Sequence, residues 1–244
     1  MTPASTIVLL PGLLCDEDVW AAQEAALSGE FNVVVGSYGV IDRIEEMAAH
    51  VLRTVSVPCF AMAGHSMGGR VALELLRQAP DRVLGLALLD TGTAALVPGP
   101  TGDDERKGRN QLLDMARRQG MEAMARQWLA SMVHADVQGT PLFERMVAMV
   151  GRSDPERFAA QINALLHRPD ALPVLHGLKV PLLLVCGQQD QWSPPSRHQA
   201  MHALVPGSQL QLIENCGHMS PMEQPGAVSA ALVEWLRRCL HDHH

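Results

Sequence analysis

Three side chains at widely separated positions could together perform nucleophilic catalysis. Ser66 lies in the glycine-rich stretch GHSMGG (64–69), and Asp190 and His218 follow it along the chain. A serine hydroxyl is a weak nucleophile until a base takes its proton, and that base needs a carboxylate to orient it. The sequence therefore holds one candidate for each of these three roles.

The surroundings of Ser66 favour a catalytic role over a flexible loop without chemistry. The run CFAMA (59–63) predicts a strand and RVALELLRQ (70–78) predicts a helix, so Ser66 falls at a strand-to-helix turn. A sharp turn there presses the residues two before and two after the serine against their neighbours, and Gly64 and Gly68 are small enough for this. The free N–H groups of the helix start would stabilise a developing negative charge.

The strand pattern predicts that these residues converge. Short apolar runs recur between segments with helical periodicity: TIVLL (6–10), FNVVV (31–35), CFAMA, VLGLALL (83–89), PLLLVC (181–186) and QLQLI (209–213). Several are apolar at consecutive positions, as in parallel strands buried on both faces. Asp190 and His218 each follow such a run, and parallel strands bring their carboxyl ends to one edge of the sheet. Asp90 also follows a run and competes with Asp190 as the acid.

The alternation predicts an α/β fold with a mostly parallel, doubly wound sheet. It breaks over residues 93–175, where the segment opens with VPGPTGDDERKGRN and helical patterns follow, beginning with QLLDMARR. We therefore expect an α/β core built from residues 1–92 and 176–244, with a helical cap inserted over 93–175.

These features together resemble the α/β-hydrolase family. The resemblance rests on four stretches that span most of the chain outside the insertion: LLPGLLCDEDVW (9–20), GHSMGG, LLLVCGQQDQWSPP (182–195) and IENCGHMSPMEQP (213–225). It implies Ser66 as nucleophile, His218 as base and Asp190 as acid. Asp190 is preferred to Asp90 because its turn, followed by WSPP, matches the commoner family pattern.

The resemblance also implies an oxyanion hole and a substrate class. The hole would be formed by the backbone N–H groups of Met67 and Leu13, with Leu14 as the alternative donor. This chain has Pro-Gly (11–12) where relatives often have His-Gly. The expected substrate is a small carboxylic ester or lactone, in a pocket whose candidate lining residues are Leu14, Trp128, Met132 and Met219.

Two other functions remain open at this point. The segment ARRQGMEAMARQWL (116–129) is similar to the cap of 3-oxoadipate enol-lactonases, and the same three residues could also serve carbon–carbon or thioester hydrolysis. A protein of this fold could instead be a non-catalytic receptor or interaction protein.

The composition argues against nucleic acid and membranes as partners. The formal net charge is −7 without a basic run, which disfavours nucleic acid, and no apolar stretch reaches the ~20 residues of a membrane helix. Five scattered cysteines and a start without a positive segment predict a cytoplasmic protein without a signal peptide. No cofactor or metal motif is found, and His198 and His202, four apart, are expected on a solvated helix face. The sequence makes no prediction of oligomeric state.

Overall fold

The computed structural model describes residues 5–241 and contains a six-stranded sheet in the order β2-β1-β3-β4-β5-β6. All neighbouring strands pair in parallel. The strands are β1 (Thr6–Leu10), β2 (Asn32–Val35), β3 (Phe60–His65), β4 (Val83–Leu89), β5 (Leu182–Gly187) and β6 (Gln209–Ile213). Each of the six predicted strands is present within one or two residues, and the expected α/β class is confirmed.

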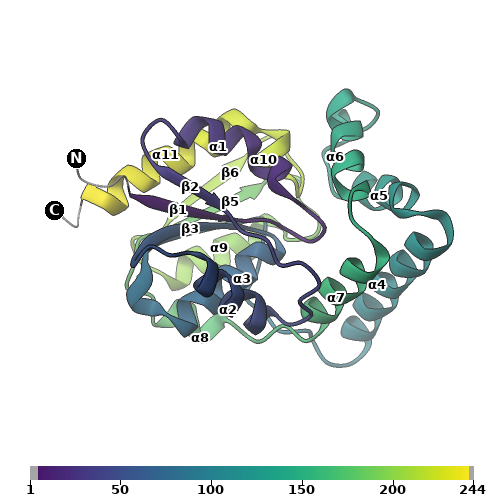
Figure 1. Ribbon diagram of the computed structural model, residues 1–244, viewed down its shortest axis with the longest axis horizontal. Coiled ribbons are helices and arrows are strands. Elements are labelled where there is room, and N and C mark those ends of the chain that lie inside the picture. Colours follow the sequence, from purple (N-terminus) through teal and green to yellow (C-terminus); the bar gives the residue numbers. More distant parts are fainter. Residues whose placement is uncertain (1–4, 242–244) are drawn as a thin grey trace.

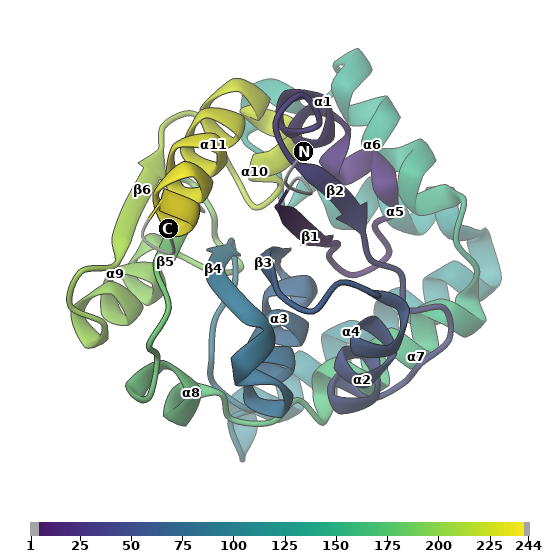
Figure 2. The same cartoon turned by 60° about the vertical axis from the view of Figure 1, so that its left-hand side comes forward.

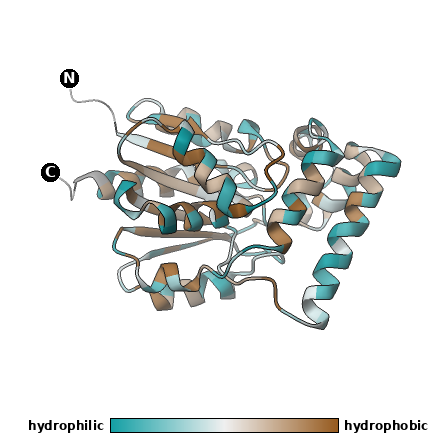
Figure 3. Ribbon diagram, turned by 60° about the horizontal axis from the view of Figure 1, so that its bottom comes forward, coloured by the Kyte–Doolittle hydropathy of each residue, from teal (hydrophilic) through white to brown (hydrophobic). Residues whose placement is uncertain are grey.

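Helices cover both faces of the sheet, as Figure 2 shows. On one face lie α1 (Ala21–Leu27) and α11 (Pro225–His241), which pack on each other beside the short α10 (Ser220–Glu223). The other face carries α2 (Ile44–Thr54), α3 (Met67–Gln78), α8 (Leu172–His176) and α9 (Pro195–Leu204). Short 3₁₀ turns stand at Glu17–Trp20, Pro80–Arg82 and Ala135–Val137. Figure 3 shows hydrophobic residues concentrated in the strands, while the helices carry residues of both kinds.

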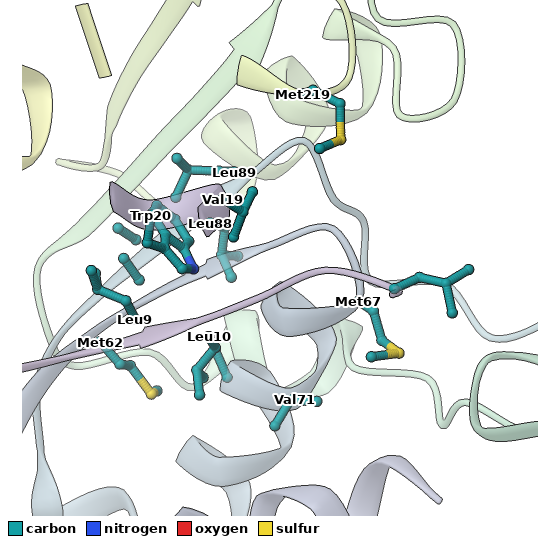
Figure 4. Close-up of a cluster of buried hydrophobic side chains, with 14 of the residues drawn as sticks. Leu9, Leu10, Val19, Trp20, Met62, Met67, Val71, Leu88, Leu89 and Met219 are labelled. Carbon is teal, nitrogen blue, oxygen red and sulfur yellow. The ribbon is translucent and has the colours of Figure 1, made fainter. Parts of the chain in front are cut away.

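The central strands form the core. The side chains of β1 and β3 are buried throughout, because helices shield both faces of these strands. Figure 4 shows Leu9, Met62 and Leu88 from three strands, with Trp20 on one side of the sheet and Val71 on the other. Burial of such large apolar side chains stabilises the fold by about 1.5–3 kcal/mol each.

A helical segment separates β4 from β5. It contains α4 (Pro100–Gln119), α5 (Met121–Ala130), α6 (Pro141–Gly151) and α7 (Pro155–Leu166). Figure 1 places these four helices in a layer beside the sheet, at the end of the molecule opposite the two termini. The strands are parallel, and β1 begins beside the amino terminus. The opposite edge of the sheet, where this layer lies, is therefore the edge at which the strands end. The exact boundaries of a cap domain stay a prediction.

The first of these helices begins earlier than the sequence indicated. Helical periodicity was expected from QLLDMARR onward, but α4 starts at Pro100 and includes the preceding charged residues. Proline suits the first helical position because its missing N–H would have no intrahelical partner there. The side chains of this charged run lie largely in water, so the run has no apolar stripe. Hydrophobic periodicity therefore could not identify it as helical. In α6 and α7, Thr140 and Asp154 cap the first turn in the same way that their residue types predict.

Among the described helices, none combines the length and the apolar character needed to cross a bilayer.

The turn between β3 and α3 depends on close backbone packing. A β-carbon at Gly68 would lie 2.0 Å from the carbonyl oxygen of Leu10, and one at Gly64 would lie 2.4 Å from that of Gly68. Both obstacles are backbone atoms, which cannot rotate away. Glycine is therefore required at both positions for β1, β3 and α3 to approach each other.

We predict that Gly68→Ala lowers the free energy of unfolding by at least about 2 kcal/mol, because overpacking must displace a central strand. The matched control is Gly108→Ala in α4, where an added β-carbon meets nothing within 4 Å. Alanine there should raise stability by about 0.5–1 kcal/mol through its helix propensity. Urea denaturation measures both changes, and equal effects at the two sites would contradict the packing argument.

Candidate active site

Ser66 occupies a strained turn. It stands directly before α3 with φ 52° and ψ −113°, in a region that non-glycine residues rarely adopt. The turn is held by Ser66 N–H donating to the Leu89 carbonyl at 2.9 Å and by Thr91 Oγ1 donating to the Ser66 carbonyl at 2.7 Å. The strain is thus balanced by bonds to β4 and the loop that follows it, and neither of these bonds uses the Ser66 hydroxyl.

The structure brings the three predicted residues together. His218 Nε2 lies 2.8 Å from Ser66 Oγ, and His218 Nδ1 lies 2.8 Å from Asp190 Oδ2. The other oxygen of Asp190 accepts the backbone N–H groups of Trp192 at 2.7 Å and Ser193 at 2.9 Å. The carboxylate is therefore fixed in orientation by the loop after β5.

The loop that carries His218 is fixed by its own set of hydrogen bonds. Glu223 accepts the N–H groups of Gly217 at 3.0 Å and Met219 at 2.9 Å, on either side of the histidine. It also accepts the N–H of His134, which lies between α5 and α6, at 2.7 Å. His218 N–H donates to the Met132 carbonyl at 2.7 Å, so the segment between β4 and β5 directly supports the histidine loop.

His65 supports the loop that carries His218. Its Nε2 lies 2.8 Å from the His218 carbonyl. Burial lowers the pKa of His65 to about 3, so the ring is neutral at pH 7 and its Nε2–H is the donor. A neutral His65 leaves His218 as the group that can exchange a proton with Ser66.

The two competing aspartates have different environments. Burial acts to raise the pKa of Asp190, but the charge and hydrogen bond of His218 outweigh it and bring that pKa below the usual value. Asp90 is fully buried, accepts the N–H groups of Gly187 at 3.0 Å and Ser220 at 3.3 Å, and makes no hydrogen bond to His218. Burial and the charge of Asp190 raise the pKa of Asp90 to about 8. Asp190 is therefore the charged partner of the imidazole, and Asp90 is the neutral one.

The pKa of His218 is raised as a result. Burial alone would lower it, but the charge and hydrogen bond of Asp190 act in the opposite direction and prevail. An imidazole in this setting can accept a proton from a hydroxyl and then remain stabilised as a cation.

The three candidate oxyanion donors have different surroundings. Leu13 and Met67 both line the cavity, and within residues 5–241 neither N–H has a protein acceptor. Met67 is the first residue of α3, where the helix leaves its N–H groups free. The N–H of Leu14 instead donates to Gln161 Oε1 at 2.8 Å, so it is occupied, and Leu14 does not line the cavity. The placement of Leu14 in the substrate pocket stays a prediction, and this cavity does not include it.

The cavity above Ser66 has a volume of about 490 Å³ and is walled partly by the helical segment. Trp128, Met132 and Met219, three of the candidate pocket residues, line it. Trp192 packs edge-on against Trp128 and lies 6.4 Å from the ring of His218, which closes one side with aromatic surface. A volume of this size suits a small organic substrate.

The expectation for the His198 and His202 pair was half wrong. His198 is completely buried, and its Nε2 accepts the N–H of Thr91 at 3.2 Å, so it supports the loop after β4. Burial lowers the pKa of His198 to about 4. Only His202 is exposed, as a solvated helix face predicts.

Within the described part of the chain, one group of side chains has ligand atoms close enough to hold a metal: Asp90, Cys186 and Asp190, whose ligand atoms lie within 4.8 Å of one another. Their chemistry does not favour this. Asp190 is bonded to His218, and burial raises the pKa of the Cys186 thiol far above its usual value, which keeps it protonated.

Comparison with known proteins identifies the family of the chain and finds solved structures with a similar fold. The model of the alpha/beta hydrolase fold matches residues 36–225, so the chain belongs to that family. A thermophilic esterase from Thermogutta terrifontis is 29% identical with a TM-score of 0.83, covering 97% of this chain and 91% of its own. The enol-lactonase from Burkholderia xenovorans LB400 is 26% identical with a TM-score of 0.82, covering 96% and 92%. A 2-succinyl-6-hydroxy-2,4-cyclohexadiene-1-carboxylate synthase from Enterobacter sp. is 27% identical over 86% of this chain and 78% of its own.

Sequence reasoning missed several residues of the site. Glu223, Gln161 and Arg70 were not singled out, although Arg70 follows Ser66 closely in the sequence, in the first turn of α3. Glu223 and Gln161 gave no such signal, because their partners are backbone N–H groups, which no residue type in the sequence identifies.

We predict that Asp90→Asn makes the stability of the protein less sensitive to pH. An unfolded aspartate loses its proton near pH 4, whereas Asp90 in the folded protein holds it up to about pH 8. Its contribution to the free energy of unfolding is therefore complete below about pH 4 and is lost as pH rises to about 8. The amide, which does not titrate, should gain stability relative to the wild type over that interval.

Urea denaturation at about pH 5 and about pH 8.5 measures this difference. The exposed Asp103→Asn serves as control and should follow the wild type at both pH values. Parallel behaviour of Asp90→Asn and the wild type would show that Asp90 is charged in the folded protein.

Proposed function

We propose that this protein is a serine hydrolase that cleaves a small carboxylic ester or lactone through an acyl-enzyme on Ser66. The observation that carries the proposal is the continuous chain of two 2.8 Å hydrogen bonds from Ser66 through His218 to Asp190 at the floor of a cavity. The similarity to an esterase and an enol-lactonase supports the same reaction class.

The proposed reaction has two halves. His218 takes the proton of Ser66, whose Oγ attacks the substrate carbonyl carbon, and the N–H groups of Leu13 and Met67 donate to the oxygen that becomes negative. His218 then protonates the leaving alkoxide, which departs and leaves the acyl group on Oγ. Water, deprotonated by His218, then attacks the acyl carbon, the bond to Oγ breaks, and His218 returns the proton to Ser66 as the acid leaves. Asp190 orients the imidazole and stabilises its cationic form throughout.

An enol-lactone is the second candidate substrate. It is favoured by the likeness to the Burkholderia enol-lactonase over nearly the whole chain and by the cap-like segment 116–129. A lactone is a cyclic ester, so the same steps open the ring without losing a fragment. Assay of esters, lactones and thioesters with one preparation of the protein ranks these classes, and the absence of turnover on all of them would favour a non-catalytic protein.

The first test is Ser66→Ala, which we predict to lower kcat for a p-nitrophenyl acetate assay by about three to six orders of magnitude. Loss of the hydroxyl removes the nucleophile but leaves the cavity intact. The control Ser28→Ala, on the surface after α1, should retain full activity, and circular dichroism should show both variants folded. Turnover by Ser66→Ala within tenfold of the wild type would rule out the acyl-enzyme.

The second test separates the two aspartates. Asp190→Asn should lower kcat/KM by about four orders of magnitude, because an amide holds His218 in the wrong tautomer. Asp90→Asn should lower it less than about tenfold, because Asp90 makes no hydrogen bond to the imidazole and an amide resembles its protonated form. The reverse order of effects would assign the acid to Asp90.

A further inference from the structure

The cavity above Ser66 is rich in arginine, although the chain as a whole is acidic. Four guanidinium groups line it, from α3, α4, the loop after α7 and α9: Arg70, Arg109, Arg168 and Arg197. Glu105 is the one acidic residue among the described side chains that line the same cavity. Four cations facing one anion is an unusual balance for a protein whose formal net charge is −7.

Glu105 neutralises only part of this charge, because two arginines share it. Arg168 binds it in a bidentate manner, with Nη1–Oε1 at 2.7 Å and Nη2–Oε2 at 2.9 Å. Arg109 Nε also donates to Glu105 Oε1 at 2.9 Å. These contacts hold α4 to the end of α7 and account for two of the four arginines.

The other two arginines lack an acidic partner among residues 5–241. Arg70 Nη1 donates to the Ala94 carbonyl at 2.9 Å, and Arg197 Nη1 donates to the Trp192 carbonyl at 3.3 Å. A guanidinium carries five N–H donors, so each keeps several that no described acceptor uses. Both groups are therefore available to an anion.

The two free guanidinium groups border the same small volume. An added β-carbon at Gly92 would lie 3.8 Å from Arg70 Nη2 and 3.8 Å from Arg197 Nη1. The absence of a side chain at Gly92 thus leaves open the space between them. Arg70 and Arg197 also line an adjoining cavity of about 270 Å³, so this pair stands where the two cavities meet.

The position of Arg70 relates this volume to the reacting group. Arg70 lies in the first turn of α3, which begins directly after Ser66, and both residues line the same cavity. A substrate whose carbonyl carbon meets Ser66 could therefore reach the arginine pair with a second functional group a few bonds away.

We propose that the substrate carries a carboxylate, which Arg70 and Arg197 hold at the junction of the two cavities while Ser66 attacks an ester or lactone carbonyl a few bonds away. This proposal rests on the hydrolase function proposed above and narrows its substrate class. Guanidinium groups match the planar carboxylate geometry and bind it more strongly than neutral donors do.

Electrostatics support an anion in this place. Burial and the nearby charge of Arg168, with smaller effects of Arg109 and Arg197, lower the pKa of Arg70 to about 9. Arg70 is still protonated at pH 7, so the arginines of this site repel one another. A bound carboxylate relieves that repulsion, which favours charged over neutral substrates.

A purely structural role for these arginines predicts a different behaviour. Arg70 and Arg168 both donate to the Ala94 carbonyl and could serve only to fasten the helical segment to the core. Their loss would then affect stability and lower the turnover of all substrates alike. Preference between a charged and a neutral substrate is the property that separates the two roles.

The test compares monomethyl esters of succinate, glutarate and adipate with the corresponding neutral amides, in which CONH₂ replaces the carboxylate. The series varies the distance between the two groups while the shape stays matched. For at least one length, wild-type kcat/KM for the acid ester should exceed that for the amide ester by about tenfold or more. Arg70→Gln and Arg197→Gln should each lower that ratio by about three- to tenfold, which brings it toward one.

Two further variants serve as controls. Arg70→Lys keeps the charge but not the planar fork, so it should restore part of the ratio. Arg118→Gln, on the exposed face of α4 away from the cavity, should leave the ratio unchanged. Arg197 is exposed, so its substitution should not impair folding. Equal ratios in the wild type and both glutamine variants would overturn the proposal.

A binding measurement separates failure of this proposal from failure of the hydrolase function. Calorimetry with Ser66→Ala and free succinate, glutarate and adipate should detect binding that Arg70→Gln weakens. Binding of this kind without any turnover by the wild type would refute the hydrolase and retain the carboxylate site. Turnover of both ester types at equal rates, without binding of any diacid, would refute the carboxylate site and retain the hydrolase.

Discussion

The contact between the start of α3 and the end of β1 is the constraint on which the site depends. Gly68 packs directly on the backbone of Leu10, at a distance that leaves no room for a β-carbon. This contact holds Ser66 in its positive-φ turn, and it brings Leu13 and Met67 to the same cavity wall. Nucleophile and candidate oxyanion donors are thus positioned by one backbone crossing rather than by side-chain contacts that could relax independently.

The histidine is positioned by a second, separate system. Its loop is bonded on both sides of His218 by Glu223, and its carbonyl is bonded by His65. Because the Met132 carbonyl accepts the His218 N–H, part of this support comes from the helical segment between β4 and β5. That segment also bonds the loop after β1 through Gln161. We infer that it both encloses the cavity and maintains the geometry at its floor.

The sequence predicted the parts of this structure that follow from local pattern. Strands with consecutive apolar residues, the glycine turn at Ser66 and the strand-end positions of Asp190 and His218 could all be read directly. Features set by tertiary contact could not. His198 is buried, and its ring accepts the N–H of Thr91. The N–H of Leu14 donates to Gln161. The helix α4 begins in a charged run without an apolar stripe. The preference for Asp190 over Asp90 required the family pattern, because both residues end a strand.

The charges of the site are arranged on two sides. Behind His218, burial keeps Asp90 neutral, so that a single negative charge, on Asp190, stabilises the imidazolium. In front of Ser66, the arginines exceed the one glutamate that faces them. If both aspartates were charged, they would repel an anion that approached the serine. A neutral Asp90 weakens that repulsion, so burial of one carboxyl group makes the positive cavity wall effective close to the reacting hydroxyl.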